Sequence, residues 1–193
     1  MGIPEKLANE VFAKSESRSW RSCVIEWEIA YCDEDDEASG TCVCGQEGLR
    51  YMYAIHNTLN GNVIYPIGSE CIKRFESNGL NDEAHCWAKA YKLVALASKY
   101  GKSRRISIYY DKSMFSRKLL AFMYRHGVFK ATEWNEWDGG NDYVFMLDMF
   151  NSQSMTSRQM KKADHVMRES VYPWLRKLYK NKNERRKQYG LQE

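Results

Sequence analysis

Three cysteines are spaced so that they could bind one metal ion. Cys42 and Cys44 are separated by a single residue and followed by Gly45, so both thiols lie on one tight turn. Gly45 lets the chain turn back and bring backbone N–H groups towards the sulfurs. Cys71 falls at an expected helix start after Ser69, where the helix dipole favours a thiolate. This arrangement predicts a structural zinc ion, which normally takes four ligands.

The fourth zinc ligand is not evident from the spacing. A treble-clef site usually offers a second ligand three residues further along the helix, but that position is Arg74. We expect Cys32 to be the fourth ligand, because it ends a predicted strand whose following loop leads directly to Cys42. Three other residues have suitable side chains and stay open as alternatives: His56, Cys23 and Cys86.

Two predicted strands flank the cysteine turn. Residues 23–31 and 49–57 alternate between apolar and polar side chains, which is typical of half-buried strands. Between them lie five adjacent carboxylates, whose mutual repulsion predicts an exposed loop. We expect this loop to be a partner-binding surface, formed by Asp33, Glu34, Asp35, Asp36 and Glu37.

A hairpin then leads to Cys71. Asn60-Gly61 is typical of a two-residue turn, so residues 63–67 are expected to return as a strand. In that register His56 lies opposite Tyr65 and roughly 20 Å from Cys71, which argues against His56 as a ligand.

From residue 81 onward the apolar residues recur with a helical period. Helices are expected to begin at Asn81 or Asp82, at Ser113, at Asp142 and at Thr156, and a short strand at 105–110. Thr156 and Gln159 fit a capping box, and Pro173 is expected to kink the last helix.

These patterns predict an α+β fold with two parts. Residues 1–80 would form a β-rich, treble-clef-like zinc module containing a β-hairpin. This module would pack on a mainly helical part, residues 81–193, which ends in a basic tail.

Composition excludes several classes of protein. The chain has 193 residues, of which 44% are hydrophobic and 13% aromatic, so long disorder is excluded for most of it. No apolar run approaches the roughly 18 residues that a membrane span needs. The N-terminal residues lack the apolar segment of a signal peptide. We therefore expect a soluble intracellular protein, in which six cysteines favour metal binding over disulfides.

The sequence does not predict an enzyme. It contains no phosphate loop, no dinucleotide-binding fingerprint and no paired-carboxylate motif. His85 and Cys86 are adjacent on a predicted helix, so their side chains diverge and cannot form a nucleophile–base pair. A treble-clef nuclease would need a general-base histidine, which the expected helix after Ser69 lacks.

Several stretches resemble a module of small phage and prophage proteins. They comprise the cysteine turn, the hairpin loop, the helix start around Cys71 and a later helical run: residues 41–45, 57–62, 67–75 and 142–151, with Thr156 and Gln159. Among proteins of this kind are zinc-containing anti-CRISPR proteins that act on the type II effector nuclease. The resemblance carries the metal ligands Cys42, Cys44 and Cys71, and no inhibitor contact residue.

This resemblance implies a stoichiometric inhibitor in the cytoplasm of the host bacterium. It would bind the type II CRISPR nuclease as its protein partner and hinder the loading or cleavage of target DNA. Its surface would make the contact, with the acidic run and a cluster of three aromatic residues as candidates: Trp134, Trp137 and Tyr143.

The alternative is a zinc-containing accessory protein of phage replication that binds nucleic acid. The net charge is +4, with an acidic N-terminal part and a basic C-terminal part. Cations in the tail would hold phosphates by releasing counterions. The residues in question are Lys180, Lys182, Arg185, Arg186 and Lys187.

Overall fold

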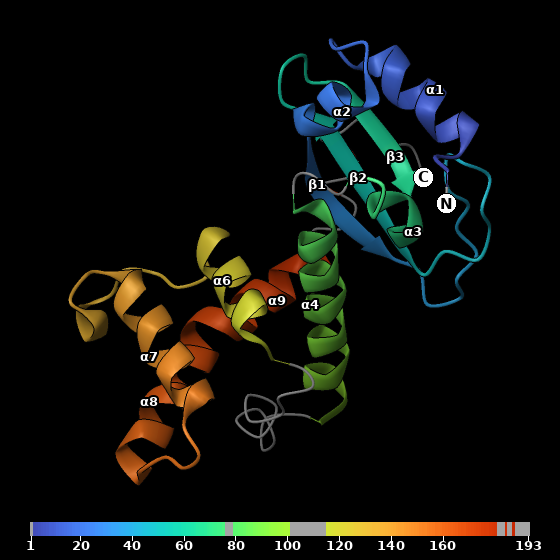
Figure 1. Ribbon diagram of the computed structural model, residues 1–193. Coiled ribbons are helices and arrows are strands. Elements are labelled where there is room, and N and C mark those ends of the chain that lie inside the picture. Colours follow the sequence, from blue (N-terminus) through green and yellow to red (C-terminus); the bar gives the residue numbers. More distant parts are fainter. Residues whose placement is uncertain (1, 76–78, 101–114, 181–183, 185–186, 188–193) are drawn as a thin grey trace. The chain divides into compact units, whose positions relative to one another are not determined.

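The computed structural model describes residues 2–75, 79–100, 115–180, 184 and 187 (Figure 1). The chain divides into two compact units, Met1–Ala88 with Lys182–Glu193 and Lys89–Asn181. The division thus falls between residues 88 and 89, whereas the sequence predicts a boundary at residue 80. No helix in the described part is long and apolar enough to cross a bilayer.

An antiparallel sheet of three strands forms the core of the first unit (Figure 1). Its order is β1 (Trp27–Glu34), β2 (Tyr51–Asn57) and β3 (Val63–Ile67). The central strand β2 is buried along most of its length, which requires apolar cover on both faces. The phenol of Tyr53 on β2 donates a hydrogen bond to the carbonyl of Ala84, 3.1 Å away. The predicted α+β class is confirmed.

The first strand begins and ends later than the sequence predicts. Ser19 caps a short helix, α2 (Trp20–Cys23), by accepting a hydrogen bond from the N–H of Ser22. A 3₁₀ turn, η1 (Val24–Glu26), continues it, so residues 23–26 are helical and not extended. The strand instead runs on to Glu34, which places Cys32 inside it.

The hairpin between β2 and β3 has a five-residue loop instead of the predicted two-residue turn. The N–H of Asn57 donates to the carbonyl of Asn62 at 2.8 Å and closes this loop. The side chain of Asn57 bonds the backbone inside the loop, a local interaction that competes with a tighter turn. His56 therefore lies opposite Val63, and the predicted pairing with Tyr65 is wrong.

A buried carboxylate joins the N-terminal region to the hairpin. Glu26 is 3% exposed, and its oxygens accept hydrogen bonds from the N–H groups of Glu16 (2.9 Å) and Ser17 (2.8 Å). The side-chain amide of Asn57 donates a third hydrogen bond at 2.6 Å. Burial raises the pKa of Glu26, but hydrogen bonds from Ser17, Glu16 and Asn57 outweigh it and lower this pKa to about 2.

The second unit is helical over its described residues. Helix α4 (Leu80–Tyr100) starts before the division and runs past it. The other segments are α6 (Arg117–Arg125), η4 (Glu133–Asn135), α7 (Gly139–Asn151), α8 (Ser157–Val166), η5 (Met167–Val171) and α9 (Tyr172–Lys180). The predicted strand at 105–110 lies outside the described residues.

Two helix starts in this unit test the capping predictions. Helix α7 is capped by Asp138, which accepts from the N–H of Gly140, and not by the predicted Asp142. Asp142 is buried and its Oδ2 accepts a hydrogen bond of 2.8 Å from Asn135 instead. The predicted start at Thr156 is confirmed. The chain is π-helical over η5, directly before Pro173, where the sequence predicts a distortion.

The capping box of α8 gives a first testable prediction. Thr156 Oγ1 accepts from the N–H of Gln159 at 3.3 Å, and Gln159 Oε1 accepts from the N–H of Thr156 at 2.8 Å. We expect Thr156→Ala to lower the free energy of unfolding by about 1 kcal/mol, because a helix-terminal N–H loses its partner. Urea unfolding measures this loss, and Thr156→Ser should retain wild-type stability. Equal losses in both variants would contradict the cap.

Candidate metal centre

The turn that carries Cys42 and Cys44 is held by its own backbone. The N–H of Cys42 donates to the carbonyl of Gln46 at 2.8 Å, and the N–H of Gly45 donates to the carbonyl of Cys42 at 2.7 Å. Gly45 has a φ of 93°, in the left-handed region that favours glycine. The requirement for glycine at this position is as predicted.

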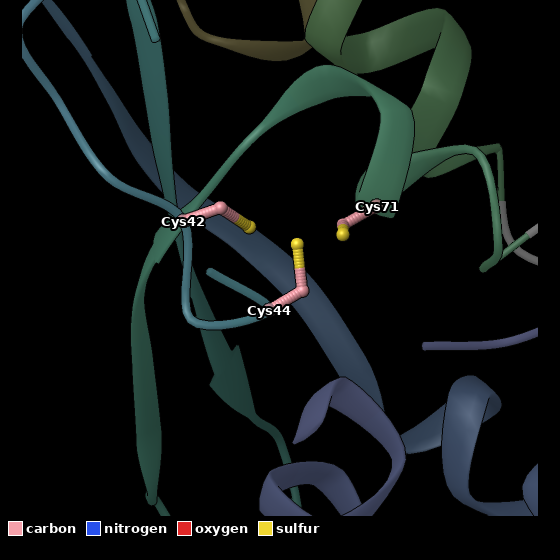
Figure 2. A group of neighbouring side chains, drawn as sticks. All are labelled: Cys42, Cys44 and Cys71. Atoms are coloured by element: carbon pink, nitrogen blue, oxygen red, sulfur yellow. The ribbon is translucent and has the colours of Figure 1, made fainter. Parts of the chain in front are cut away.

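Cys71 reaches the same place from the helix α3 (Ser69–Ile72), which follows β3. The Sγ atoms of Cys42, Cys44 and Cys71 all lie within 4.8 Å of one another. Figure 2 shows the three side chains pointing towards one another from the turn and from the helix. Cys42 and Cys71 are buried and Cys44 is partly exposed, so the cluster sits just below the surface.

Backbone contacts join the cysteine turn to the start of α3. The N–H of Val43 donates to the carbonyl of Pro66 at 2.9 Å. The N–H of Gly68 donates to Cys42 Sγ at 3.3 Å. A Cβ atom at position 68 would lie 2.7 Å from Cδ2 of the buried Leu49, so a larger residue here would require that leucine side chain to move.

The cluster stabilises one thiolate in the absence of a cation. The thiol of Cys71 donates to the sulfur of Cys42 and lowers the pKa of Cys42 to about 5, against the opposing effect of burial. Backbone N–H groups, including that of Gly68, support the same charge. The pKa of Cys71 is raised, because its proton is held between the two sulfurs and burial disfavours a second anion. A cation that displaces the two remaining protons would hold all three thiolates.

Cys32, the predicted fourth ligand, does not lie in this cluster. It sits on β1 opposite Tyr53, is buried, and places its Sγ 3.5 Å from the carbonyl oxygen of Asp33. A ligand role would require Cys32 to lie at the end of its strand, from where the chain could fold back towards the turn. Because β1 continues to Glu34, the ladder with β2 fixes Cys32 away from the other three.

None of the alternative ligands joins the cluster either. Among the described residues, the group of histidine, cysteine and carboxylate side chains at this place consists of the three cysteines. Cys23 Sγ donates to the carbonyl of Ser17 at 3.2 Å, and Cys86 is buried in α4. His56 lies opposite Glu28 of β1 in the register of the sheet. The described residues therefore offer three protein ligands.

The five adjacent carboxylates do not form one exposed loop, which corrects the prediction. Asp33 is fully buried on β1, and its Oδ2 accepts a hydrogen bond of 3.1 Å from the phenol of Tyr65. Arg50 pairs with Glu34 at 3.1 Å and with Asp36 at 3.3 Å, which relieves the repulsion on which the prediction relied. Asp33 is thus unable to contact a partner.

The remaining carboxylates shape a turn. Asp35 accepts hydrogen bonds from the N–H of Glu37 at 3.0 Å and from the N–H of Ser39 at 2.8 Å. Asp36 and Glu37 are exposed, whereas Glu34 and Asp35 are only partly so. Of the predicted partner surface, two carboxylates are therefore exposed, and one of them, Asp36, is paired with Arg50.

The fold and the cluster define an α+β protein with three cysteines that could hold a metal ion. No protein-family model matches the chain, and neither a curated protein nor a solved structure matches it. What the cluster can bind is thus argued from its own chemistry. Three thiols favour soft or borderline cations over Mg²⁺ and Ca²⁺, which prefer oxygen ligands.

Proposed function

We propose that Cys42, Cys44 and Cys71 bind one structural Zn²⁺ ion in a treble-clef-like site. The single observation that carries this proposal is the convergence of the three Sγ atoms within 4.8 Å. Zn–S bonds of about 2.3 Å in a tetrahedron place sulfurs about 3.8 Å apart. Small rotations of the cysteine side chains would bring the sulfur atoms from within 4.8 Å to this spacing.

The ion would lock the cysteine turn to α3, next to the sheet. Three thiolates around a divalent cation leave one negative charge, which needs compensation. A Cβ atom at Gly45 would lie 3.6 Å from Lys6 Nζ, so the ammonium of Lys6 lies beside the turn, where it would offset that charge. We assign the fourth position of the ion to a water molecule, because Cys44 is partly exposed.

Chelation tests this part of the proposal. We expect a strong chelator to lower the melting temperature of the full-length protein by about 10 °C or more, because the ion joins two segments of the core. Zinc should restore the original value and magnesium should not. A melting temperature that chelator and added zinc leave unchanged would contradict a structural ion.

We further propose that the protein is a phage-encoded anti-CRISPR inhibitor of the type II effector nuclease. The resemblance of its cysteine turn, hairpin loop and helix start to such proteins supports this proposal. The protein would act by binding and not by catalysis, in the cytoplasm of the host bacterium. Asp36 and Glu37, beside the metal module, would imitate phosphates in a basic DNA channel of the nuclease.

A cleavage assay with purified guide-loaded type II nucleases tests the inhibitor. We expect a tenfold excess of the full-length protein to suppress cutting of target DNA by at least one nuclease of a panel. Replacing both Asp36 and Glu37 by lysine should weaken this inhibition, since it reverses the charge of the proposed contact. Lysine at Glu5 and Glu10, on α1, is the matched control for net charge. Normal cutting by every nuclease would contradict the proposal.

A further inference from the structure

A groove in the second unit combines an exposed tryptophan with several cations. It has a volume of about 600 Å³ and lies between η4 and α8. Trp134, in η4, is 79% exposed, and the centroid of its ring lies 5.8 Å from that of His165. A flat aromatic surface thus forms part of the wall, open to a ligand.

The cations of the groove come from one face of α8 and its continuation. Arg158, Lys162 and His165 follow one another at steps of four and three residues, and Lys161 and Arg168 flank this row on the same face. The permanently charged members are Arg158, Lys161, Lys162 and Arg168. The spacing of these basic residues is visible in the sequence. The sequence does not indicate, however, that Trp134 faces them.

Two carboxylates also line the groove, and both already have cationic partners. Asp164 pairs with Arg168 at 3.1 Å. Asp142 is buried, accepts a hydrogen bond from Asn135 and lies 3.9 Å from Lys162. Among the described residues, Arg158 and Lys161 form no ion pair, and both are exposed. The groove therefore has two cations available for an anion.

The backbone next to Trp134 is held in an unusual conformation. Glu136 and Trp137 have φ values of 58° and 61°, which residues other than glycine rarely adopt. Asn135 is 2% exposed and fixes this turn, accepting from the N–H of Thr132 at 2.7 Å and donating to Asp142 at 2.8 Å. A strained backbone is kept only where surrounding interactions hold it. The hydrogen bonds of Asn135 therefore keep the turn next to Trp134 in one conformation.

The sequence alone suggests that acidic neighbours would keep phosphate away from these tryptophans. In the structure Glu133, Glu136 and Asp138 are not part of the groove lining. Trp137 is exposed but lies outside the lining, and Tyr143 stacks on Tyr124 with ring centroids 4.7 Å apart. Trp134 alone of the three predicted aromatics faces the cations.

We propose that this groove binds a nucleotide unit, with the base stacked on Trp134 and the phosphate held by Arg158 and Lys161. Stacking of a base on an aromatic ring together with cations along the backbone is how proteins hold single-stranded nucleic acid. The same chemistry serves a free nucleotide, and the volume of the groove suits either source. This site is independent of the cysteine cluster and of the proposed inhibitor function.

Fluorescence anisotropy with the full-length protein tests the proposal. The probe is a labelled 12-residue oligothymidylate at 50 mM salt, with unlabelled mononucleotides as competitors. We expect Trp134→Ala to weaken binding roughly tenfold or more, because it removes the stacking platform. Trp134→Phe should restore most of the affinity. Trp137→Ala is the matched control, since Trp137 is 72% exposed on the same turn, and it should bind like the wild type.

The salt dependence of oligonucleotide binding tests the roles of Arg158 and Lys161. Replacing Arg158 and Lys161 together by alanine should reduce the slope of log K against log salt by about 0.7, the value for one phosphate contact on a single strand. Competition by a mononucleotide would identify a free nucleotide as the ligand, and competition by oligomers alone would identify a single strand. No binding, equal effects of the Trp134 and Trp137 variants, or affinity lost only through changes in the basic tail would overturn the site.

Discussion

Replacing Cys71 by serine should abolish stoichiometric zinc binding and lower the free energy of unfolding by more than about 3 kcal/mol. Cys71 is the proposed ligand from α3, and without it the turn that carries Cys42 and Cys44 would lose its proposed link through the ion. Serine is close in size, so the loss reports the missing thiolate and not a cavity. Zinc content after dialysis and urea unfolding measure the two effects.

Cys32→Ser is the matched control for this experiment. Cys32 is as buried as Cys71 but lies outside the cluster. We expect its serine variant to keep one zinc per chain and to lose stability only modestly. Loss of zinc from the Cys32 variant, with zinc retained in the Cys71 variant, would contradict the arrangement of the site.

Replacing Glu26 by glutamine should cost about 3 kcal/mol of stability at neutral pH. The pKa of Glu26 is lowered from its ordinary value of 4.5 to about 2 by the hydrogen bonds that outweigh its burial. A difference of about 2.5 pKa units corresponds to about 3 kcal/mol, at about 1.4 kcal/mol per unit. The amide of glutamine would also point an N–H₂ group at the donors of Glu16, Ser17 or Asn57.

The pH dependence of this effect has a definite sign. Because the pKa of Glu26 is lower in the folded state, its contribution is fully present above pH 4.5 and is lost as the pH falls through 4.5 towards 2. Urea unfolding of the wild type and the variant should therefore converge at the acid end. Glu28→Gln, at an exposed position of β1, is the control and should change stability by less than about 0.5 kcal/mol. A gap between the wild type and Glu26→Gln that is independent of pH would contradict the buried anion.

Local patterns in the sequence were sufficient for two of the strands and for two features of the cluster. Alternation predicts β2, the turn signal at Asn60-Gly61 predicts a returning strand at β3, the glycine after Cys44 predicts the tight turn, and the Ser69 region predicts the helix that carries Cys71. Each of these depends on residues that are neighbours in the chain, so the sequence contains the necessary information.

The error at Cys32 concerns interactions between distant residues. The pairing of Arg50 with Glu34 and the bond from Tyr65 to Asp33 accompany the extension of β1 to Glu34, into the acidic run, which keeps Cys32 away from the cysteine cluster. Tertiary partners thus overrode the charge repulsion on which the prediction relied. The error in the hairpin is local, because the Asn57 side chain bonds the backbone of the loop and competes with the two-residue turn that Asn60-Gly61 favours.

The groove beside Trp134 was missed for a related reason. The row of cations that begins at Arg158 and the tryptophan are separated in the sequence, and the acidic residues around Trp134 suggested that phosphate would be repelled. In the structure those acidic residues do not line the groove. Helical spacing of the cations on α8 was the one available sign of a shared face.

X-ray absorption at the zinc edge, together with metal analysis of the purified full-length protein, tests the metal centre most directly. We expect one zinc per chain, bound by three sulfur atoms at about 2.3 Å and one lighter atom. Folded protein without bound zinc, or zinc coordinated by fewer than three sulfurs, would contradict the assignment of Cys42, Cys44 and Cys71.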